Sequence, residues 1–284
     1  MELVLKSTPE LVDLEKSDFD WFRELIERES GIHIRENKYM FMYNRLLRRI
    51  RNLGMDNFSQ YKDYLRTGEG FEKELGKLLE EIVIPESSFF RYQPQFEMLV
   101  SMILPDLMKR RIMQGKPLNV VSFGCATGEE PYSIALLLYD RLSVSQRQLV
   151  RIRAVDLSET LLSKAREGLY EESDLANVPP IFLSQYFIRE NGGYRLISRV
   201  SQMVHFYKFN LVHENWTRFN FSDLAFCRNT TIYFNKEARH QVNYNLKNCL
   251  RENGYLVLGH TEIINGDQNG LKHMGNMVYR KVNP

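Results

Sequence analysis

The sequence predicts an α/β fold with a mostly parallel sheet, preceded by a small all-helical domain. Over the first 84 residues, apolar side chains recur every three to four positions, which is the period of an amphipathic helix. From Pro117 onward, short apolar strands alternate with helices, and this order is typical of a parallel sheet with helices on both faces. The chain has 284 residues, of which 43% are hydrophobic, so it can form one large and one smaller core.

The helical domain is predicted over residues 1–84. Its repeating apolar residues are Phe19, Phe22, Leu25 and Ile26, followed by Met42, Leu46, Leu47 and Ile50. Helix ends are expected at Gly31, at Gly54 and at the pair Gly68 and Gly70, because glycine interrupts helices.

Residues 85–116 are predicted to link this domain to the sheet and to begin the catalytic domain, with a helix starting near Pro94. The sheet domain is predicted over residues 117–284. Its elements are expected at 118–123, 131–142, 151–156, 158–170, 223–229, 236–250, 254–260 and 279–282, with strands and helices alternating until the last two, which are both strands. Residues 187–210 interrupt this order with β-like alternation around a turn-prone Asn-Gly-Gly, which predicts a small inserted β-subdomain.

Composition and charge exclude several classes of protein. Lys and Arg total 38 and Asp and Glu total 36, so the net charge of +2 gives no overall attraction to nucleic acid or an anionic membrane. Cys125, Cys227 and Cys249 are widely spaced, as expected of reduced thiols rather than disulfides or a zinc site. We find no signal peptide and no apolar run of about 18–20 residues, which predicts a cytoplasmic protein without membrane insertion. The six histidines show no metal-ligand spacing, and no metal is predicted.

Residues 124–131 join the first strand of the sheet to the next helix, where open α/β sheets bind their ligands. Gly124 and Gly128 allow the backbone to approach a ligand closely. Glu129 and Glu130 would repel a pyrophosphate at this helix N-terminus, and the sequence contains neither GxGxxG nor GxxxxGK[ST]. A cationic nucleoside without phosphates fits better, and S-adenosylmethionine is one. The alternative is that the two glutamates only stabilise the helix dipole.

Asp156 ends the second predicted strand and comes just before the next helix. Carboxylates at this position commonly bind ribose hydroxyls. The alternative role for Asp156 is a helix cap. Together with the 124–131 loop, Asp156 favours a nucleoside site.

The sequence also resembles a known family over nearly its whole length. The matching segments are SSFFR (87–91), TGEEPYSIA (127–135), AVDLSETLLSKAREGLY (154–170), FNL (209–211), CRNTTIYF (227–234) and GYLVLGHTE (254–262), with YNRLLRRIRNLG (43–54) in the helical part. In this order and spacing they are similar to the chemotaxis receptor methyltransferases. The resemblance implies a Rossmann-like, mostly parallel sheet of seven strands, an N-terminal helical domain and an inserted β-subdomain. It also implies methyl transfer from S-adenosylmethionine to receptor glutamates, which yields glutamate methyl esters and S-adenosylhomocysteine.

The resemblance implies a set of site residues by matching motif positions. Those for the cofactor are Ser87, Arg91, Glu130, Asp156, Asn210, Leu211, Arg228 and Asn229. Arg91 and Tyr233 are implied to lie nearest the reacting groups, as the catalytic residues. Without the resemblance, a salt bridge for Arg91 and a core position for Tyr233 are the simpler interpretations. The chain departs from the family at Pro85, where Asn is usual, and at Thr230 and Thr231, where apolar residues are usual.

Two surfaces are predicted to bind the receptor. Arg45, Arg48 and Arg49 share a face of the helix expected at 38–53 and are predicted to dock the acidic cytoplasmic helices of chemoreceptors. A solvated helix face is the alternative, and nucleic acid is disfavoured because no stacking platform is evident. For part of the family, the resemblance implies that the β-subdomain at 187–210 binds a peptide at the receptor's C-terminus.

Two other functions stay open at this stage. Pro85 motivates a catalytically weak relative that binds S-adenosylmethionine as a regulatory module, because the usual Asn amide is lost. The second is a methyltransferase that acts on another protein or on a small acid.

Overall fold

The computed structural model describes residues 13–190, 192–262, 264 and 270–282. The chain divides into two compact units, one ending at Val83 and the other beginning at Ile84. Residues 1–12 of the predicted helical domain, which include the start of the chain examined for a signal peptide, lie outside the described residues. Each unit is considered by itself below.

Helices make up the first unit. Its described part contains α1 (Lys16–Ser30), the 3₁₀ turn η1 (Glu36–Lys38), α2 (Tyr39–Leu53), α3 (Phe58–Arg66) and α4 (Gly68–Ile82). Gly31 and Gly54 end α1 and α2 in the left-handed conformation, so these two predicted helix ends are confirmed. Gly68 and Gly70 lie in the first turn of α4, and Thr67 caps that helix by accepting a hydrogen bond from the Gly70 N–H.

The core of the first unit is formed by the apolar faces that the sequence predicts. Phe22, Ile26, Met42 and Leu46 are completely buried. The ring of Phe22 stacks on Tyr61 of α3, with 5.6 Å between the ring centroids. Burial of each such side chain stabilises the unit by about 1.5–3 kcal/mol, so packing of these faces holds the four helices together.

Arg49 belongs to this core and not to a docking surface. Its guanidinium donates from Nε to Glu74 Oε1 at 2.7 Å and from Nη2 to Oε2 at 3.1 Å, and Tyr61 donates to the same carboxylate at 3.1 Å. Arg49 is 9% exposed and Glu74 is 1% exposed. The hydrogen bond with Glu74 raises the pKa of Arg49. The prediction that Arg49 shares an exposed face with Arg45 and Arg48 is therefore wrong, because an acidic partner on α4 draws this side chain inward.

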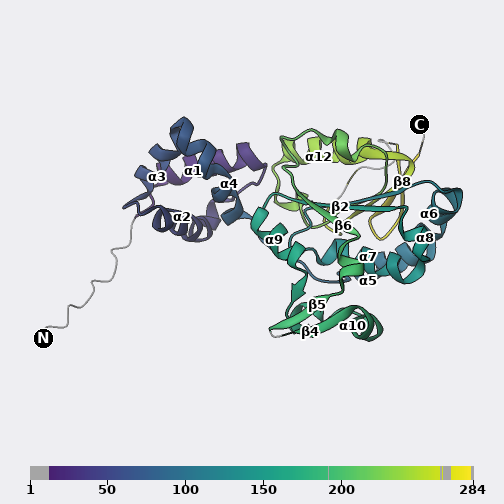
Figure 1. Ribbon diagram of the computed structural model, residues 1–284. Helices are drawn as coiled ribbons and strands as arrows, with labels where there is room; N and C mark the ends of the chain where they lie inside the picture. The colour runs from purple at the N-terminus through teal and green to yellow at the C-terminus, as the bar shows by residue number, and fades with distance from the viewer. Residues whose placement is uncertain (1–12, 191, 263, 265–269, 283–284) are drawn as a thin grey trace, which may run out of the picture. The chain divides into compact units, whose positions relative to one another are not determined.

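The second unit is built on a twisted sheet (Figure 1). Its strands in the described part of the chain are β1 (Leu118–Phe123), β2 (Val150–Asp156), β6 (Val204–Lys208), β7 (Ser222–Cys227), β8 (Leu250–Leu258), β9 (Leu271–Gly275) and β10 (Val278–Lys281). They lie in the order β6-β2-β1-β7-β8-β10-β9, and the first five are parallel, while β10 is antiparallel to both neighbours. The predicted seven-stranded, mostly parallel sheet is confirmed, although the sequence did not reveal β9.

Helices cover both faces of this sheet. α7 (Glu129–Arg141) and α9 (Glu159–Glu167) connect β1 to β2 and then lead toward β6, while α12 (Lys236–Cys249) connects β7 to β8. Because right-handed crossovers that run in opposite directions along a sheet fall on opposite faces, α7 and α9 lie on one face and α12 on the other (Figure 1). The direction reverses at β1, and ligands bind at the carboxyl ends of strands at such a switch point.

The remaining helices of the second unit are short. α5 (Gln93–Met98) and α6 (Leu104–Arg110) are joined by the π-helical turn Leu99–Ile103, and α8 (Val144–Arg147) precedes β2.

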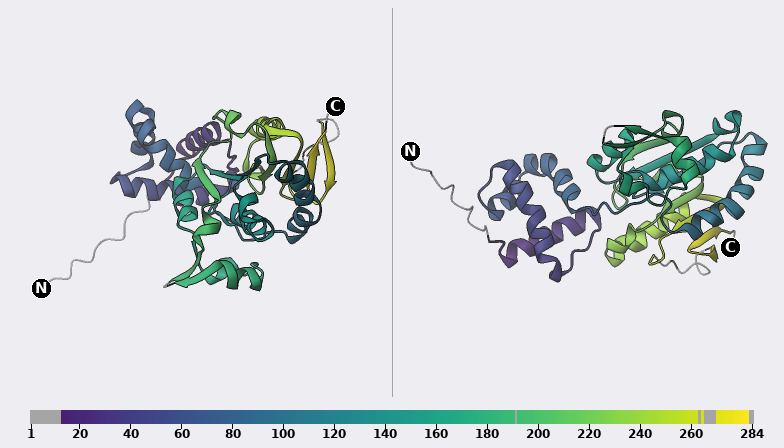
Figure 2. Two further views of the ribbon diagram at one scale, coloured as in Figure 1. Left: turned by 45° about the vertical axis from the view of Figure 1, so that its right-hand side comes forward. Right: turned by 90° about the horizontal axis from the view of Figure 1, so that it is seen from below.

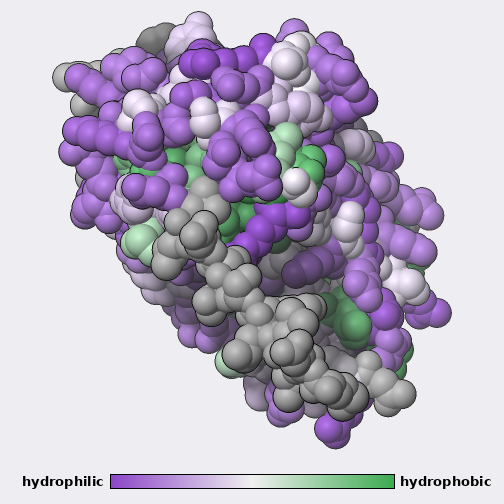
Figure 3. Space-filling model, turned by 90° about the vertical axis from the view of Figure 1, so that its left-hand side faces the viewer, coloured by the Kyte–Doolittle hydropathy of each residue, from purple (hydrophilic) through white to green (hydrophobic). Residues whose placement is uncertain are grey.

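Among the residues that the structure describes, no helix is long and apolar enough to cross a membrane. Hydrophilic residues cover most of the face shown in Figure 3. The three cysteines are buried and free, as predicted.

A second, three-stranded sheet lies apart from the main one. It contains β3 (Leu169–Tyr170), β5 (Gly193–Leu196) and β4 (Phe187–Glu190) in that order, all antiparallel. With α10 (Pro180–Tyr186) it forms an arm that projects from the main sheet (Figures 1 and 2).

The predicted β-subdomain at 187–210 is therefore correct for β4 and β5 and wrong at its end. Residues 204–208 form β6, which pairs with β2 at the edge of the main sheet, after the short helix α11 (Ser198–Ser201). The alternating pattern of an edge strand is the same in a small appendage and in a large sheet, so the sequence could not separate the two. The predicted helix at 158–170 also ends early, because Gly168 adopts a φ of 63° and the chain then enters β3.

Candidate active site

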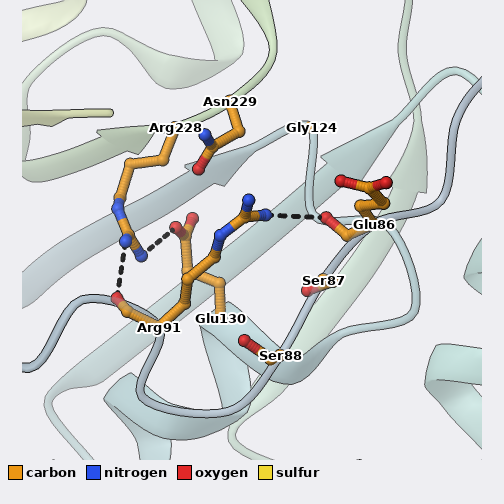
Figure 4. Close-up of a pocket in the computed structure, with 8 residues that line it drawn as sticks. All are labelled: Glu86, Ser87, Ser88, Arg91, Gly124, Glu130, Arg228 and Asn229. Atoms are coloured by element: carbon orange, nitrogen blue, oxygen red, sulfur yellow. Dashed lines mark hydrogen bonds and ion pairs between the residues drawn. The ribbon is translucent and has the colours of Figure 1, made fainter. Parts of the chain in front are cut away.

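A pocket in the second unit gathers residues from three segments of the chain (Figure 4). Its lining residues are Glu86, Ser87, Ser88, Arg91, Gly124, Glu130, Arg228 and Asn229. They come from the loop before α5, from the β1–α7 connection with the first turn of α7, and from the turn after β7. Five of the eight residues implied for the cofactor thus line one pocket, while Glu86 and Ser88 were not expected there.

The loop after β1 approaches the turn after β7 very closely. Gly124 has a φ of 69°, and a Cβ built on it would lie 2.2 Å from Thr230 Oγ1. Any larger residue at this position would displace Thr230. Glycine is required here by both backbone conformation and space.

Glu130 and Arg228 form an ion pair at one wall of the pocket, with 11% of the Glu130 side chain and 3% of the Arg228 side chain exposed (Figure 4). Ser122 Oγ donates to Glu130 Oε1 at 2.7 Å, and Arg228 Nη1 donates to Glu130 Oε2 at 3.1 Å. Burial raises the pKa of Glu130, although Arg228 and Ser122 act in the opposite direction. The Glu130 carboxylate is thus held by Ser122 and Arg228 in the lining of the pocket, while Glu130 itself lies in the first turn of α7.

Arg91 lies on a loop with strained backbone. Phe90 and Tyr92, on either side of it, have φ values of 50° and 62°, which bulky residues rarely adopt. The carbonyl oxygen of Arg91 accepts a hydrogen bond from Arg228 Nη2 at 2.5 Å. The guanidinium of Arg91 donates from Nη1 to the Glu86 carbonyl oxygen at 3.0 Å (Figure 4). Strain of this kind is held by surrounding contacts and is common at functional sites.

Glu262 holds the turn after β7. Its buried carboxylate accepts hydrogen bonds from the N–H groups of Asn229, Thr230, Thr231 and Gly259 and from Thr231 Oγ1, at 2.7–2.9 Å. Thr230 Oγ1 donates to the Arg228 carbonyl oxygen at 3.1 Å. Both threonine hydroxyls thus have the partners that their burial requires. Sequence reasoning missed Glu262, and its only signal was the HTE at the end of a matching segment.

Asp156, Asn210 and Leu211 lie at the same edge of the sheet but do not line this pocket. The Asp156 carboxylate accepts hydrogen bonds from the Ala126 N–H at 2.9 Å and from the Ser158 N–H at 3.0 Å. Ser158, not Asp156, caps α9, so the alternative role of Asp156 as the helix cap is wrong. Asn210 and Leu211 follow β6, which pairs with β2 next to Asp156.

Tyr233 is half-buried at the end of the 3₁₀ turn Thr231–Tyr233. Burial raises the pKa of its hydroxyl, the charge of Glu86 raises it further, and the charge of Arg91 lowers it. Tyr233 is therefore a protonated hydrogen-bond donor at neutral pH, in the electrostatic range of both Glu86 and Arg91.

Comparison with protein families identifies the chain. Residues 85–280 match the model described as CheR methyltransferase, SAM binding domain, and residues 17–83 match that described as CheR methyltransferase, all-alpha domain. The chain belongs to the CheR methyltransferase family. S-Adenosylmethionine is thus the cofactor of the second unit, and the first unit is the family's all-helical domain.

Curated relatives of this CheR methyltransferase span nearly its whole length. The chemotaxis protein methyltransferase of Borreliella burgdorferi is 29% identical over 95% of this chain and 96% of its own length. Chemotaxis protein methyltransferase 2 of Vibrio cholerae is 33% identical over 87% of this chain and 85% of its own. The chemotaxis protein methyltransferase of Escherichia coli is 31% identical over 98% of this chain and 94% of its own.

The pocket has the charges that S-adenosylmethionine requires. The amino-acid end of the cofactor carries an ammonium and a carboxylate, and the residues that line the pocket include the acidic Glu86 and Glu130 and the basic Arg91 and Arg228. Arg228 Nε is buried and has no hydrogen-bond partner among the described residues. Two carboxylates at the N-terminus of α7 disfavour a phosphate ligand. The residues present therefore fit this cofactor.

Proposed function

We propose that this protein transfers the methyl group of S-adenosylmethionine to glutamate side chains of bacterial chemoreceptors and forms glutamate methyl esters. The observation that carries the proposal is the pocket of mixed charge, with Glu130, Arg228 and Arg91, at the carboxyl edge of the methyltransferase sheet. The chemotaxis methyltransferases that the chain resembles over nearly their full length support the substrate class. We further propose that it acts in the cytoplasm, where the receptor's methylated helices lie.

The proposed reaction needs positioning more than proton transfer. A glutamate side chain has a pKa of about 4.3 and is already ionised near neutral pH, so no strong base is required. When bound, the cofactor supplies an electrophilic methyl on a sulfonium. Arg91 orients the substrate carboxylate through a bidentate contact, and the Tyr233 hydroxyl donates a hydrogen bond to the same group. Ser87, Glu130, Asp156, Asn210, Leu211, Arg228 and Asn229 hold the cofactor.

Replacement of Arg91 tests this assignment. Arg91→Ala should lower turnover about 100-fold, because the substrate oxygen is no longer held in line with the methyl group. Arg91→Lys keeps the charge but loses the bidentate geometry, so it should fall between wild type and the alanine variant. The assay is base-labile methyl incorporation into receptor helices, measured beside calorimetric binding of S-adenosylmethionine. Near-normal methylation by Arg91→Ala would contradict the catalytic role, and binding of the cofactor by wild type without any turnover would favour a regulatory module instead.

We also propose that α2 contributes to receptor docking through Arg45 and Arg48. Arg48 is about half exposed and pairs with Glu81 at 3.2 Å, and the guanidinium of Arg45 lies 4.9 Å from the centroid of the Phe41 ring. Acidic receptor helices are the complementary partner for such a surface.

The proposed site for the receptor's C-terminal peptide is β4, an edge strand of the small sheet. Ile188 on this strand is 57% exposed, which suits an added strand with apolar side chains. Methylation of receptors with and without their C-terminal residues tests it. Equal KM values for the two receptors would remove this proposal.

A further inference from the structure

The carboxylate of Glu262 accepts five hydrogen bonds, which is more than the capping of one turn requires. Its Oε1 accepts from the Thr230 N–H at 2.9 Å, the Thr231 N–H at 2.7 Å and Thr231 Oγ1 at 2.9 Å. Its Oε2 accepts from the Asn229 N–H at 2.7 Å and the Gly259 N–H at 2.8 Å. The side chain is 4% exposed, so each of these donors would be left buried without a partner if the carboxylate were removed.

The donors come from two loops at neighbouring strand ends. Asn229, Thr230 and Thr231 follow β7, and Gly259 follows β8. Asn229 has a φ of 56°, an unfavourable conformation that its N–H bond to Glu262 helps to hold. The loops are in such close contact that a Cβ at Gly259 would lie 2.7 Å from Glu262 Oε2 and 3.0 Å from the Asn229 nitrogen.

The loop after β8 also contacts the strained loop that carries Arg91. The imidazole of His260 lies against the ring of Tyr92, with 4.9 Å between the centroids and a tilt of 43°. His260 follows Gly259, and Tyr92 follows Arg91. The loop after β8 therefore touches both segments that place arginines in the pocket, although the pocket lining includes none of its residues.

We propose that Glu262 is a positioning residue for methyl transfer, which acts by fixing Arg228 and Asn229 in the geometry that holds the cofactor. The proposal rests on the cofactor role of Arg228 and Asn229 proposed above. Glu262 touches neither substrate nor cofactor in this scheme. Its hydrogen bonds fix the turn after β7 as a preorganised wall of the pocket, and such support of a binding residue by its neighbours commonly decides affinity.

The decisive variant is Glu262→Gln. A glutamine presents one acceptor oxygen, so its NH₂ group must face two or three of the five donors. We expect the Kd for S-adenosylmethionine to rise at least tenfold and kcat to fall, while KM for the receptor changes less than twofold. Hydrogen exchange at the Asn229 and Thr230 amides should become faster. All measurements use the full chain.

Asp223→Asn is the matched control. Asp223 lies on the same strand, β7, at its opposite end, is 1% exposed and pairs with Arg111 and Arg251. This variant should lose thermal stability to a similar degree and keep the wild-type Kd for the cofactor. If both variants weaken cofactor binding equally, Glu262 only stabilises the fold and the proposal is overturned.

Thr231→Val and Thr231→Ser keep the test decisive if Glu262→Gln does not fold. Valine removes one of the five hydrogen bonds and should raise the cofactor Kd about threefold, whereas serine should keep the wild-type value. Identical Kd values for the two variants would overturn the proposal. Failure of wild type itself to bind S-adenosylmethionine would instead overturn the proposed function, so the two failures are distinguishable.

Discussion

In the described part of each unit, an arginine and a glutamate form an ion pair with little exposed surface, and the two pairs differ in how completely their polar atoms are satisfied. In the first unit, Arg49 binds both oxygens of Glu74, and Tyr61 donates to the same carboxylate. In the second, Arg228 contacts Glu130 through one nitrogen at 3.1 Å and turns another to the Arg91 carbonyl oxygen. Arg228 Nε has no partner among the described residues, and the pair lines a pocket.

The difference is the one expected between an ion pair that only stabilises the fold and a pair with the binding role proposed for Glu130 and Arg228. Bringing charges out of water is costly, and the cost is offset only where the remaining donors and acceptors are satisfied. The pair of Arg49 and Glu74 meets this condition within the helical unit. The pair of Glu130 and Arg228 meets it only in part, which leaves charge for the ammonium and carboxylate of a ligand. Three substitutions or conditions test this contrast, beginning with the largest effect.

Removal of Arg49 should strongly destabilise the first unit. Arg49→Met leaves Glu74 buried without its main partner, and the free energy of unfolding should fall by about 3–5 kcal/mol. Thermal and urea unfolding of the full chain measure the loss. The double variant Arg49→Met, Glu74→Met removes both charges and should recover most of the stability. An undiminished midpoint for Arg49→Met would show that the pair does not hold α2 to α4.

Acidification should weaken cofactor binding because it protonates the carboxylate of Glu130, which removes its negative charge. Burial raises the pKa of Glu130 above its ordinary 4.5. The protonated form therefore stabilises the folded protein at low pH. This stabilisation is lost as the pH rises through the raised pKa. In the proposed site, the ammonium of the cofactor pairs with the ionised form of Glu130. Below the raised pKa, the Kd for S-adenosylmethionine should therefore increase by up to about tenfold per pH unit.

Calorimetric titrations between pH 8 and pH 5 measure this dependence. Glu130→Gln should bind weakly and without the pH slope, which assigns the slope to this carboxylate. The same slope in Glu130→Gln would assign it to another group.

Charge reversal at Arg48 should have the smallest effect. Arg48→Glu should raise KM for the receptor a few-fold and change the free energy of unfolding by less than about 1 kcal/mol, because its pair with Glu81 is exposed. Lys73→Glu on α4 is the control, because Lys73 is also an exposed cation, with 64% of its side chain accessible against 51% for Arg48. The Kd for the cofactor should not change in either variant. If Lys73→Glu raises KM as much as Arg48→Glu does, the effect is general repulsion and α2 is not a specific docking surface.

Sequence patterns predicted most of the fold. Phe22, Met42 and Leu46 lie in the core of the first unit as their spacing predicts, because a helix can bury only one face. The positions of the pocket residues that follow strand ends could also be predicted, because the carboxyl ends of parallel strands meet at one edge of the sheet. Their shared pocket does not test their roles. The roles in cofactor binding and catalysis all stay predictions, and they concern Ser87, Arg91, Glu130, Asp156, Asn210, Leu211, Arg228, Asn229 and Tyr233.

The sequence by itself determined the order and type of most elements and favoured a cationic ligand, because local periodicity and the positions of glycine and glutamate carry that information. Only the tertiary structure decided which charged residues become buried partners. Arg48 and Arg49 are neighbours in the sequence, yet one is exposed and the other lies in the core. Glu262 acquires its role from donors about thirty residues away. β6 pairs with β2 rather than with β5, which has β3 on one side and β4 on the other. Such long-range pairings leave no periodic signal in the sequence.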